Sequence, residues 1–304
     1  MMPVYENRTL ALQYGRDILT LQYPAYVSWI ILSILNILAG GKLMINDWSS
    51  MHKNLKIYLK AAVFCDFSCT VTFLVQASYY CLIFLDQGRA FWTPNPIECF
   101  KSLCIQGFFM EACTKLLFVA CFDRFLYHFA PNCYAYMSTI YAYSIIVKVG
   151  LTEILSLLIG YHFKPDYLTG VFLPICTWEL SWAFDAEKIV RIREWVMFLT
   201  RICPLVFLLP SLFYILRRRK EDKERDDEEK ETKNDHLETK EIGLLICMIF
   251  WKFAMFASRR AITRFSEHFS GRESVMDAFG EPLNMNFCII CYFLINFWPS
   301  YEIK

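Results

Sequence analysis

Two neighbouring charged residues, Asp123 and Arg124, lie at the end of a long apolar stretch. An arginine held by an adjacent acid can exchange that partner for acceptors on another protein, because its planar guanidinium carries five donors in a fixed fork. An ion pair that merely ends a membrane helix would use the same residue types. The residues around the pair, from Cys121 to Tyr127 and on to Pro131, decide between these two interpretations.

Further polar side chains interrupt the apolar stretches, where an ionised group costs about 3 kcal/mol on insertion scales and needs a partner or a polar cavity. Glu111 and Lys115 are spaced i,i+4, which predicts an ion pair on one helix face, with Glu111 facing a ligand cavity as the alternative. Lys148 and Glu153 are five residues apart, so we expect each of them to pair with another helix. The other candidate polar residues inside the membrane are Asn36, Asp66, Lys252, Asn284 and Tyr292.

The sequence does not predict a metal centre or an active site. The five histidines are scattered along the chain, and no pair has the spacing of metal ligands. The G-x-S-x-G, H-E-x-x-H and phosphate-binding glycine patterns are absent. The 31 basic and 30 acidic residues give a net charge of +1, without the basic excess of a nucleic-acid-binding protein. We therefore expect no metal, no cofactor, no enzymatic activity and no nucleic-acid partner.

The elements that position these residues are apolar stretches long enough to cross a membrane. The hydrophobic fraction of the 304 residues is 56%, too high for two soluble domains that keep their apolar surface buried. A membrane span needs about 20 apolar residues. Seven stretches come close to this length, at residues 24–45, 57–85, 97–122, 135–161, 195–216, 242–258 and 283–299. The sequence therefore predicts an all-α membrane protein, with a seven-helix bundle over residues 24–303 after an N-terminal segment of residues 1–23.

The loops predict the orientation of this bundle. Basic residues within 53–60 and at 217–220 flank the first and fifth connections, which the positive-inside rule places in the cytoplasm. The arginines within 259–264 oppose this orientation. The sequence Asn7-Arg8-Thr9 is a glycosylation acceptor pattern and supports an extracellular N-terminus. We therefore expect the N-terminus outside, the C-terminus in the cytoplasm, and a charged cytoplasmic loop over residues 217–241.

Most of the thirteen cysteines lie inside the predicted spans, where they are expected to be small packing residues. Cys99 and Cys176 differ, because the predicted topology places both on the oxidising side of the membrane. A bond between them would tie the loop after the fourth span across the mouth of the bundle. By the loop-entropy account, such a bond contributes a few kcal/mol of stability.

The stretch from Cys99 to Pro131 resembles the third helix and second intracellular loop of rhodopsin-like G-protein-coupled receptors. In that family a cysteine opens the third helix outside the cell and an Asp/Glu-Arg-Tyr motif closes it inside. Here Cys99 lies 25 residues before Arg124, and Phe125 replaces the tyrosine. Asn36 and Asp66 resemble the polar residues of the family's first and second helices.

The last two spans depart from the pattern of that family. The sixth has Phe250-Trp251-Lys252-Phe253 where the family usually has C-W-x-P, so the proline kink is missing. The seventh lacks N-P-x-x-Y, although Asn284 and Tyr292 lie in the corresponding region. With these losses and a high content of Phe, Tyr and Cys, the chain resembles the divergent nematode serpentine chemoreceptors.

This resemblance implies a chemosensory receptor of the plasma membrane, with sensory-neuron cilia as its place of action. It would transmit the binding of an extracellular small molecule or peptide to a heterotrimeric G protein, with the lipid bilayer as its surroundings. The residues implied in coupling are Asp123, Arg124, Phe125, Tyr127 and Pro131.

Two alternatives remain open at this point. A multi-pass transporter or channel would use Asp66, Glu111, Lys148 and Glu153 as charges along its pathway. The absence of an internal repeat weighs modestly against a repeat-built transporter. The second alternative is a receptor-like fold that no longer signals, which the weak sixth and seventh spans would explain.

Overall fold

The computed structural model describes residues 7–46, 48, 51–85, 93–162, 170–173, 176, 187–223, 241–251 and 287–297. Lys252 and Asn284, two of the candidate intramembrane residues, lie outside these ranges. So do parts of the predicted sixth and seventh spans and most of the charged loop, at 252–258, 283–286, 298–299 and 224–240.

Helices make up nearly all of the described chain. Five are long: α1 (Arg8–Ile45), α2 (Lys53–Leu85), α3 (Pro96–Phe129), α5 (Thr139–His162) and α6 (Glu187–Lys223). The short α4 (Pro131–Tyr134) joins α3 to α5, α9 covers Phe287–Phe297, and an unlabelled helix covers Glu241–Trp251. The prediction of an all-α protein is thereby confirmed for the described residues.

Five helical segments are long and apolar enough to cross a membrane: Tyr26–Ile45, Lys53–Leu85, Pro96–Phe129, Thr139–His162 and Phe198–Arg218. They correspond to the first five predicted spans. The Glu241–Trp251 helix is apolar but shorter, and it covers the beginning of the predicted sixth span. The long helices α1 and α6 extend beyond their apolar segments, α1 toward the N-terminus and α6 at both ends.

Local sequence signals explain where α3 begins and ends. Asn95 and Glu98 form a capping box, in which each side chain accepts a hydrogen bond from the other residue's backbone N–H at 2.8 and 3.2 Å. Pro96 occupies the first turn, where its missing N–H has no cost. At the other end α3 stops at Phe129, shortly before Pro131 begins α4. The helix therefore continues past the predicted boundary at residue 122, carrying the charged pair on its last two turns.

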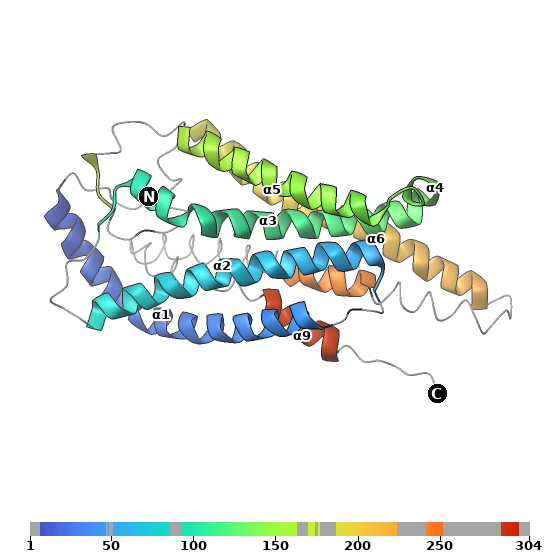
Figure 1. The fold of residues 1–304 in the computed structure, drawn as a ribbon, viewed down its shortest axis with the longest axis horizontal. Helices are drawn as coiled ribbons and strands as arrows, with labels where there is room; N and C mark the ends of the chain where they lie inside the picture. Colours follow the sequence, from blue (N-terminus) through green and yellow to red (C-terminus); the bar gives the residue numbers. More distant parts are fainter. Residues whose placement is uncertain are drawn as a thin grey trace.

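Successive long helices run in opposite directions, and α3 packs against α2, α5 and α6 (Figure 1). α9 lies against α1 and α2. The largest buried apolar cluster joins α1, α2, α3, α5, α6, the Glu241–Trp251 helix and α9. The bundle has two ends: the Arg124 end, where α2 begins and α3 ends, and the disulfide end, where α3 begins. Packing, rather than a hydrophobic force, is the main contribution to helix association in lipid.

Gly40 allows α1 to approach α9 closely. A Cβ atom at this position would lie 3.0 Å from Sγ of Cys288 and 3.2 Å from the ring of Phe67. At the neighbouring Gly41 no atom lies within 4 Å of such a Cβ. The absent side chain of Gly40 is therefore what lets the start of α9 pack against α1.

Candidate functional site

Arg124 and Asp123 are buried at the end of α3, with relative exposures of 1% and 4%. Oδ2 of Asp123 accepts hydrogen bonds from Nε and Nη2 of Arg124 at 3.1 and 2.6 Å. A charge pair taken out of water in this way persists only when hydrogen bonds satisfy its remaining donors and acceptors. The other partners of the guanidinium therefore matter for its role.

The third guanidinium contact crosses to a helix far away in the sequence. Nη1 of Arg124 donates to Oε2 of Glu241 at 3.1 Å, and Glu241 is 4% exposed. Glu241 lies on the described helical stretch Glu241–Trp251. Its other carboxylate oxygen accepts the backbone N–H of His52 at 2.6 Å. Glu241 thus joins the end of α3 to the residue that precedes α2.

Tyr134 of α4 completes the cluster. Its hydroxyl accepts hydrogen bonds from Nη2 of Arg124 at 2.9 Å and from the amide of Asn54 at 3.3 Å. The same hydroxyl donates to Oδ2 of Asp123 at 3.2 Å and lies 3.0 Å from Nδ1 of His52, with which it shares a hydrogen bond. The Arg124 cluster, defined here as His52, Asn54, Asp123, Arg124, Tyr134 and Glu241, therefore ties together α2, α3, α4 and the Glu241–Trp251 helix.

Burial and positive charge tune two titratable groups of this cluster. Burial, together with the positive charges of Arg124 and Lys53, lowers the pKa of His52 from its ordinary 6.5 to about 4. His52 is therefore neutral at physiological pH. Burial also raises the pKa of Tyr134, so its hydroxyl keeps the proton that it shares with its acceptors.

The other residues predicted to act in coupling surround the cluster. The Tyr127 ring lies 4.9 Å from Cζ of Arg124 and forms a cation–π contact with it. The centre of the Phe125 ring lies 5.3 Å from that of Phe207 on α6. Pro131 begins α4 and so helps to direct Tyr134 toward Arg124. The sequence thus predicted the Asp123–Arg124 pair at the centre of the cluster and the aromatic residues Phe125 and Tyr127 beside it.

A second polar network lies midway along the bundle. Nδ2 of Asn36 on α1 donates to Oδ2 of Asp66 on α2 and to Oγ1 of Thr70, both at 2.8 Å. The first turn of α9 completes it: Cys288 N donates to Oδ2 of Asp66 at 3.2 Å, and Ile289 N donates to Oδ1 of Asn36 at 3.0 Å. Asn36 and Asp66, predicted as intramembrane polar residues, therefore bind the N–H groups that begin α9.

Tyr292, a third predicted polar residue, faces α1. Its hydroxyl accepts a hydrogen bond from Nζ of Lys42 at 2.7 Å, and the Lys42 ammonium also lies 5.0 Å from the centre of its ring. The Asn36–Asp66 network and the Lys42–Tyr292 contact together hold the first two turns of α9 against α1.

Lys115 has a partner on another helix. It forms an ion pair with Glu153 of α5, and the Glu153 side chain is buried. The expectation for Lys115 was an ion pair with Glu111 on its own helix, whereas Glu153 was expected to pair with another span. The second expectation agrees with this contact. Packing of α5 against α3 brings Glu153 within reach, which residue spacing along α3 does not reveal.

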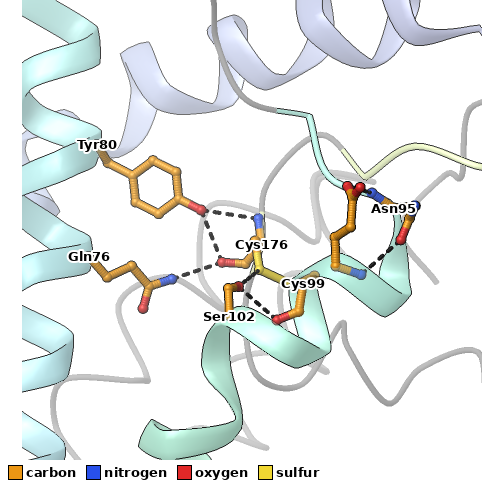
Figure 2. The surroundings of a disulfide bond; sticks show 7 residues. Gln76, Tyr80, Asn95, Cys99, Ser102 and Cys176 are labelled. Atoms are coloured by element: carbon orange, nitrogen blue, oxygen red, sulfur yellow. Dashed lines mark hydrogen bonds between the residues drawn. A yellow bond between two sulfur atoms is a disulfide. The ribbon is translucent and has the colours of Figure 1, made fainter. Parts of the chain in front are cut away.

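Cys99 and Cys176 are joined by a disulfide bond, with their Cα atoms 5.4 Å apart (Figure 2). The loop residue Cys176 is also bound to α2: the Tyr80 hydroxyl accepts its N–H and donates to its carbonyl, both at 3.1 Å. Nε2 of Gln76 donates to the same carbonyl at 2.9 Å. The disulfide and these hydrogen bonds fix this point of the loop between α2 and α3.

Two amide oxygens near the disulfide end are buried and have no hydrogen-bond partner among the described residues, Oε1 of Gln76 and Oε1 of Gln106. Each could accept a hydrogen bond from a bound molecule. Asn7, the glycosylation candidate, is exposed near this end, and its side-chain oxygen accepts the backbone N–H of Thr9 at 2.8 Å. Within the described ranges no group of three or more His, Cys, Asp or Glu residues could hold a metal ion.

Sequence reasoning did not select His52, Asn54, Tyr134 or Glu241, although they complete the Arg124 cluster. Glu241 lies directly before the apolar stretch that begins at residue 242, but this position does not indicate a contact with Arg124. Tyr134 carried no local signal, because its role depends on α4 turning the chain back toward α3. No protein-family model matches the chain, and no curated protein matches it. Its function must therefore be inferred from its own residues.

Proposed function

We propose that the chain is a seven-span receptor that couples an extracellular ligand to a heterotrimeric G protein, with the Arg124 end in the cytoplasm. The observation that carries this proposal is the buried guanidinium of Arg124, shared between Asp123 on its own helix and Glu241 on a distant one. In a closed, uncoupled state, contacts between helices must hold the guanidinium of the arginine so that its N–H groups cannot bind a partner protein.

Opening would proceed by separation of the helices at the Arg124 end. When the Glu241–Trp251 helix moves outward, Nη1 of Arg124 loses its partner while Asp123 keeps its bonds to Nε and Nη2. The freed donor then faces the cavity that opens beside it and can bind the G protein. A ligand favours this state only through its higher affinity for it, so the ligand site must change shape together with the Arg124 end.

The disulfide end is the proposed ligand side. The loop held at Cys176 lies between α2 and α3, and the buried oxygens of Gln76 and Gln106 lie on those same two helices. The Gln76 and Gln106 oxygens thus give the ligand side hydrogen-bond acceptors at fixed positions in an otherwise apolar bundle. The proposed topology has its N-terminus and Asn7 outside, and its C-terminus inside.

The transporter alternative gains no support from the positions of its charges. Asp66 belongs to the network with Asn36 and α9, and Glu153 to the ion pair with Lys115 between α3 and α5. Asp66 and Glu153 thus belong to different helix contacts.

The test needs no known ligand. Glu241→Gln keeps the side-chain volume but removes the charge that holds Arg124, so ligand-independent G-protein recruitment in a reporter cell should rise. A loss of about 1.4 kcal/mol from the closed state corresponds to about a tenfold rise in the open population. Arg124→Ala added to this variant should abolish recruitment at equal surface expression. Undiminished recruitment by the double variant would refute the proposed coupling role.

The topology is tested separately with epitope tags at the two termini. Antibody should reach an N-terminal tag on intact cells and a C-terminal tag only after permeabilisation. If both tags are reached from the same side, the number of spans is even and the receptor topology is wrong.

A further inference from the structure

Lys148 lies near the middle of α5, a helix long and apolar enough to cross a membrane. At a rise of about 1.5 Å per residue, its Cα atom is about 14 Å from the Thr139 end of the helix and about 21 Å from the His162 end. A lysine close to the end of a span extends its ammonium to the water interface, but both ends are too distant here. In a membrane-spanning α5, the charge of Lys148 therefore lies at the depth of the lipid tails.

The Lys148 side chain is exposed on the side of α5 that faces away from the bundle. The buried residues of α5 are Ala142, Glu153 and Gly160, which lie on the face that packs against α3 and α2. With about 100° between successive residues, Lys148 and Glu153 point about 140° apart around the helix axis. Glu153 pairs with Lys115 of α3 instead. Within the described ranges, no hydrogen bond or ion pair reaches Lys148.

The residues around Lys148 on this exposed face have the spacing of a helix–helix contact. Intervals of three and four residues alternate along the face, as in the left-handed helix pairs that are common in membranes. The members of this Lys148 seam are Tyr141, Ser144, Lys148, Leu151, Leu155 and Leu158. Ser144 is half-buried, and the other members are exposed. Apolar side chains on this face would suit lipid alone, whereas one lysine within such a seam fixes the register between two helices.

The charge of Lys148 determines which partner fits the seam. An ionised group at this depth needs a partner of opposite charge or a polar cavity, and lipid phosphates lie too far away at the membrane surface. In a symmetric dimer, a two-fold axis normal to the membrane would make the two α5 helices parallel, so that Lys148 would face its own copy at the same depth. Like charges at such a contact repel each other, which disfavours a second copy of the chain.

We propose that the Lys148 seam binds a transmembrane helix of a different membrane protein, and that an Asp or Glu near the middle of that helix pairs with Lys148. The ion pair satisfies the ammonium, while the apolar residues of the seam pack against the partner helix. The seam lies opposite the contact between α5 and α3, so the partner binds without any opening of the bundle. The proposal depends on α5 spanning the membrane and is independent of G-protein coupling.

Synthetic transmembrane peptides test the seam on the full chain in lipid vesicles at neutral pH. Each peptide is a run of leucines with one central residue, Glu in the first and Gln in the second, and in a third peptide the Glu lies at one end of the run. Energy transfer from the labelled chain to the labelled peptide, at low peptide density, measures binding. The central-Glu peptide should bind at least about tenfold more tightly than the other two, because only this peptide brings a carboxylate to the depth of Lys148.

Three variants show whether Lys148 is responsible for this preference. Lys148→Leu should remove the preference and keep the fold, since it replaces an exposed side chain that has no partner among the described residues. Lys148→Arg keeps the charge and should keep the preference. Lys101→Leu is the matched control, because Lys101 is an exposed lysine near the start of α3, and it should also keep the preference.

Charge reversal tests the same contact a second time. Lys148→Glu should bind a peptide with a central Lys at least about tenfold more tightly than the central-Glu peptide, which is the opposite of the wild-type order. Equal binding of the central-Glu and central-Gln peptides to the wild-type chain, or an unchanged preference in Lys148→Leu, would overturn the proposal. Energy transfer between wild-type chains that Lys148→Leu weakens would also overturn it, since a second copy would then be the occupant.

Discussion

Arg124 and Glu241 lie 117 residues apart in the sequence, yet their side chains meet at 3.1 Å in the interior of the bundle. Both side chains are nearly inaccessible to solvent. Breaking a buried ion pair by removing one partner costs about 3–5 kcal/mol, because the remaining charge stays buried without compensation. The contact is therefore important for the stability of the closed arrangement as well as for the proposed coupling.

Replacement of Arg124 by Gln should lower the free energy of unfolding by about 3–5 kcal/mol, since Asp123 and Glu241 would both remain buried without their cation. Glu241→Gln should lower the free energy of unfolding less in the Arg124→Gln chain than in the wild-type chain, because in the variant it removes a buried charge that has lost its partner. Thermal unfolding of the four purified chains in detergent measures this coupling. Arg217→Gln, at an exposed position on α6, is the control and should change stability by about 1 kcal/mol or less, because exposed charged contacts contribute little. Strict additivity of the two substitutions would contradict the contact.

Tyr134→Phe removes only the hydroxyl that joins α4 to the cluster. Because Arg124, Asp123, Asn54 and His52 all lose a hydrogen-bond partner in a buried place, we expect a loss of about 1–3 kcal/mol. Tyr136→Phe is the matched control, since Tyr136 is 90% exposed and lies two residues further along the chain. Chemical unfolding of both variants measures the difference. Similar values for the two would show that the Tyr134 hydroxyl does not stabilise the bundle.

His52 should make the Arg124 end sensitive to acid. Its pKa is lowered to about 4 by burial and by the positive charges of Arg124 and Lys53. Between pH 6.5 and pH 4 the unfolded chain therefore binds a proton at His52 that the folded chain does not, so stability rises with pH across this window and falls as the medium becomes acidic. His52→Gln should flatten this part of the stability curve, while leaving the unfolding midpoint above pH 7 less affected. An unchanged slope between pH 6.5 and pH 4 would contradict the prediction.

The elements of the fold follow from the sequence where the signals are local. Apolar length predicted the first five spans, and the Asn95-Pro96 start and the Pro131 stop explain the limits of α3. The sequence also indicated Asp123 and Arg124, the central residues of the Arg124 cluster, because an adjacent acid and arginine at the end of an apolar helix is a local pattern. The structure adds the start of α5 at Thr139, four residues after the predicted boundary, where the Ser138 hydroxyl accepts the N–H of Tyr141.

What the sequence could not show depends on contacts between distant helices. Spacing along α3 favoured Glu111 as the partner of Lys115, but Lys115 reaches Glu153 because α5 packs beside it. Glu241 was assigned only to the boundary of a charged loop, since nothing local indicates that it meets Arg124. Such pairs are determined by helix packing, and a single sequence carries no periodicity from which they can be read.

Gly40 and Gly41 provide a test of the packing that positions α9. Gly40→Val would place its Cβ 3.0 Å from Sγ of Cys288 and 3.2 Å from the ring of Phe67, whereas the space beside Gly41 is open. We expect Gly40→Val to lower stability by about 1–3 kcal/mol through overpacking. Gly41→Val should leave stability unchanged or raise it slightly, because valine has a higher helix propensity than glycine. Since Asn36 and Asp66 bind the first N–H groups of α9, Gly40→Val should also increase the rate of hydrogen exchange at Cys288 and Ile289. Equal stability and equal exchange in the two variants would show that α9 does not depend on the close approach of α1.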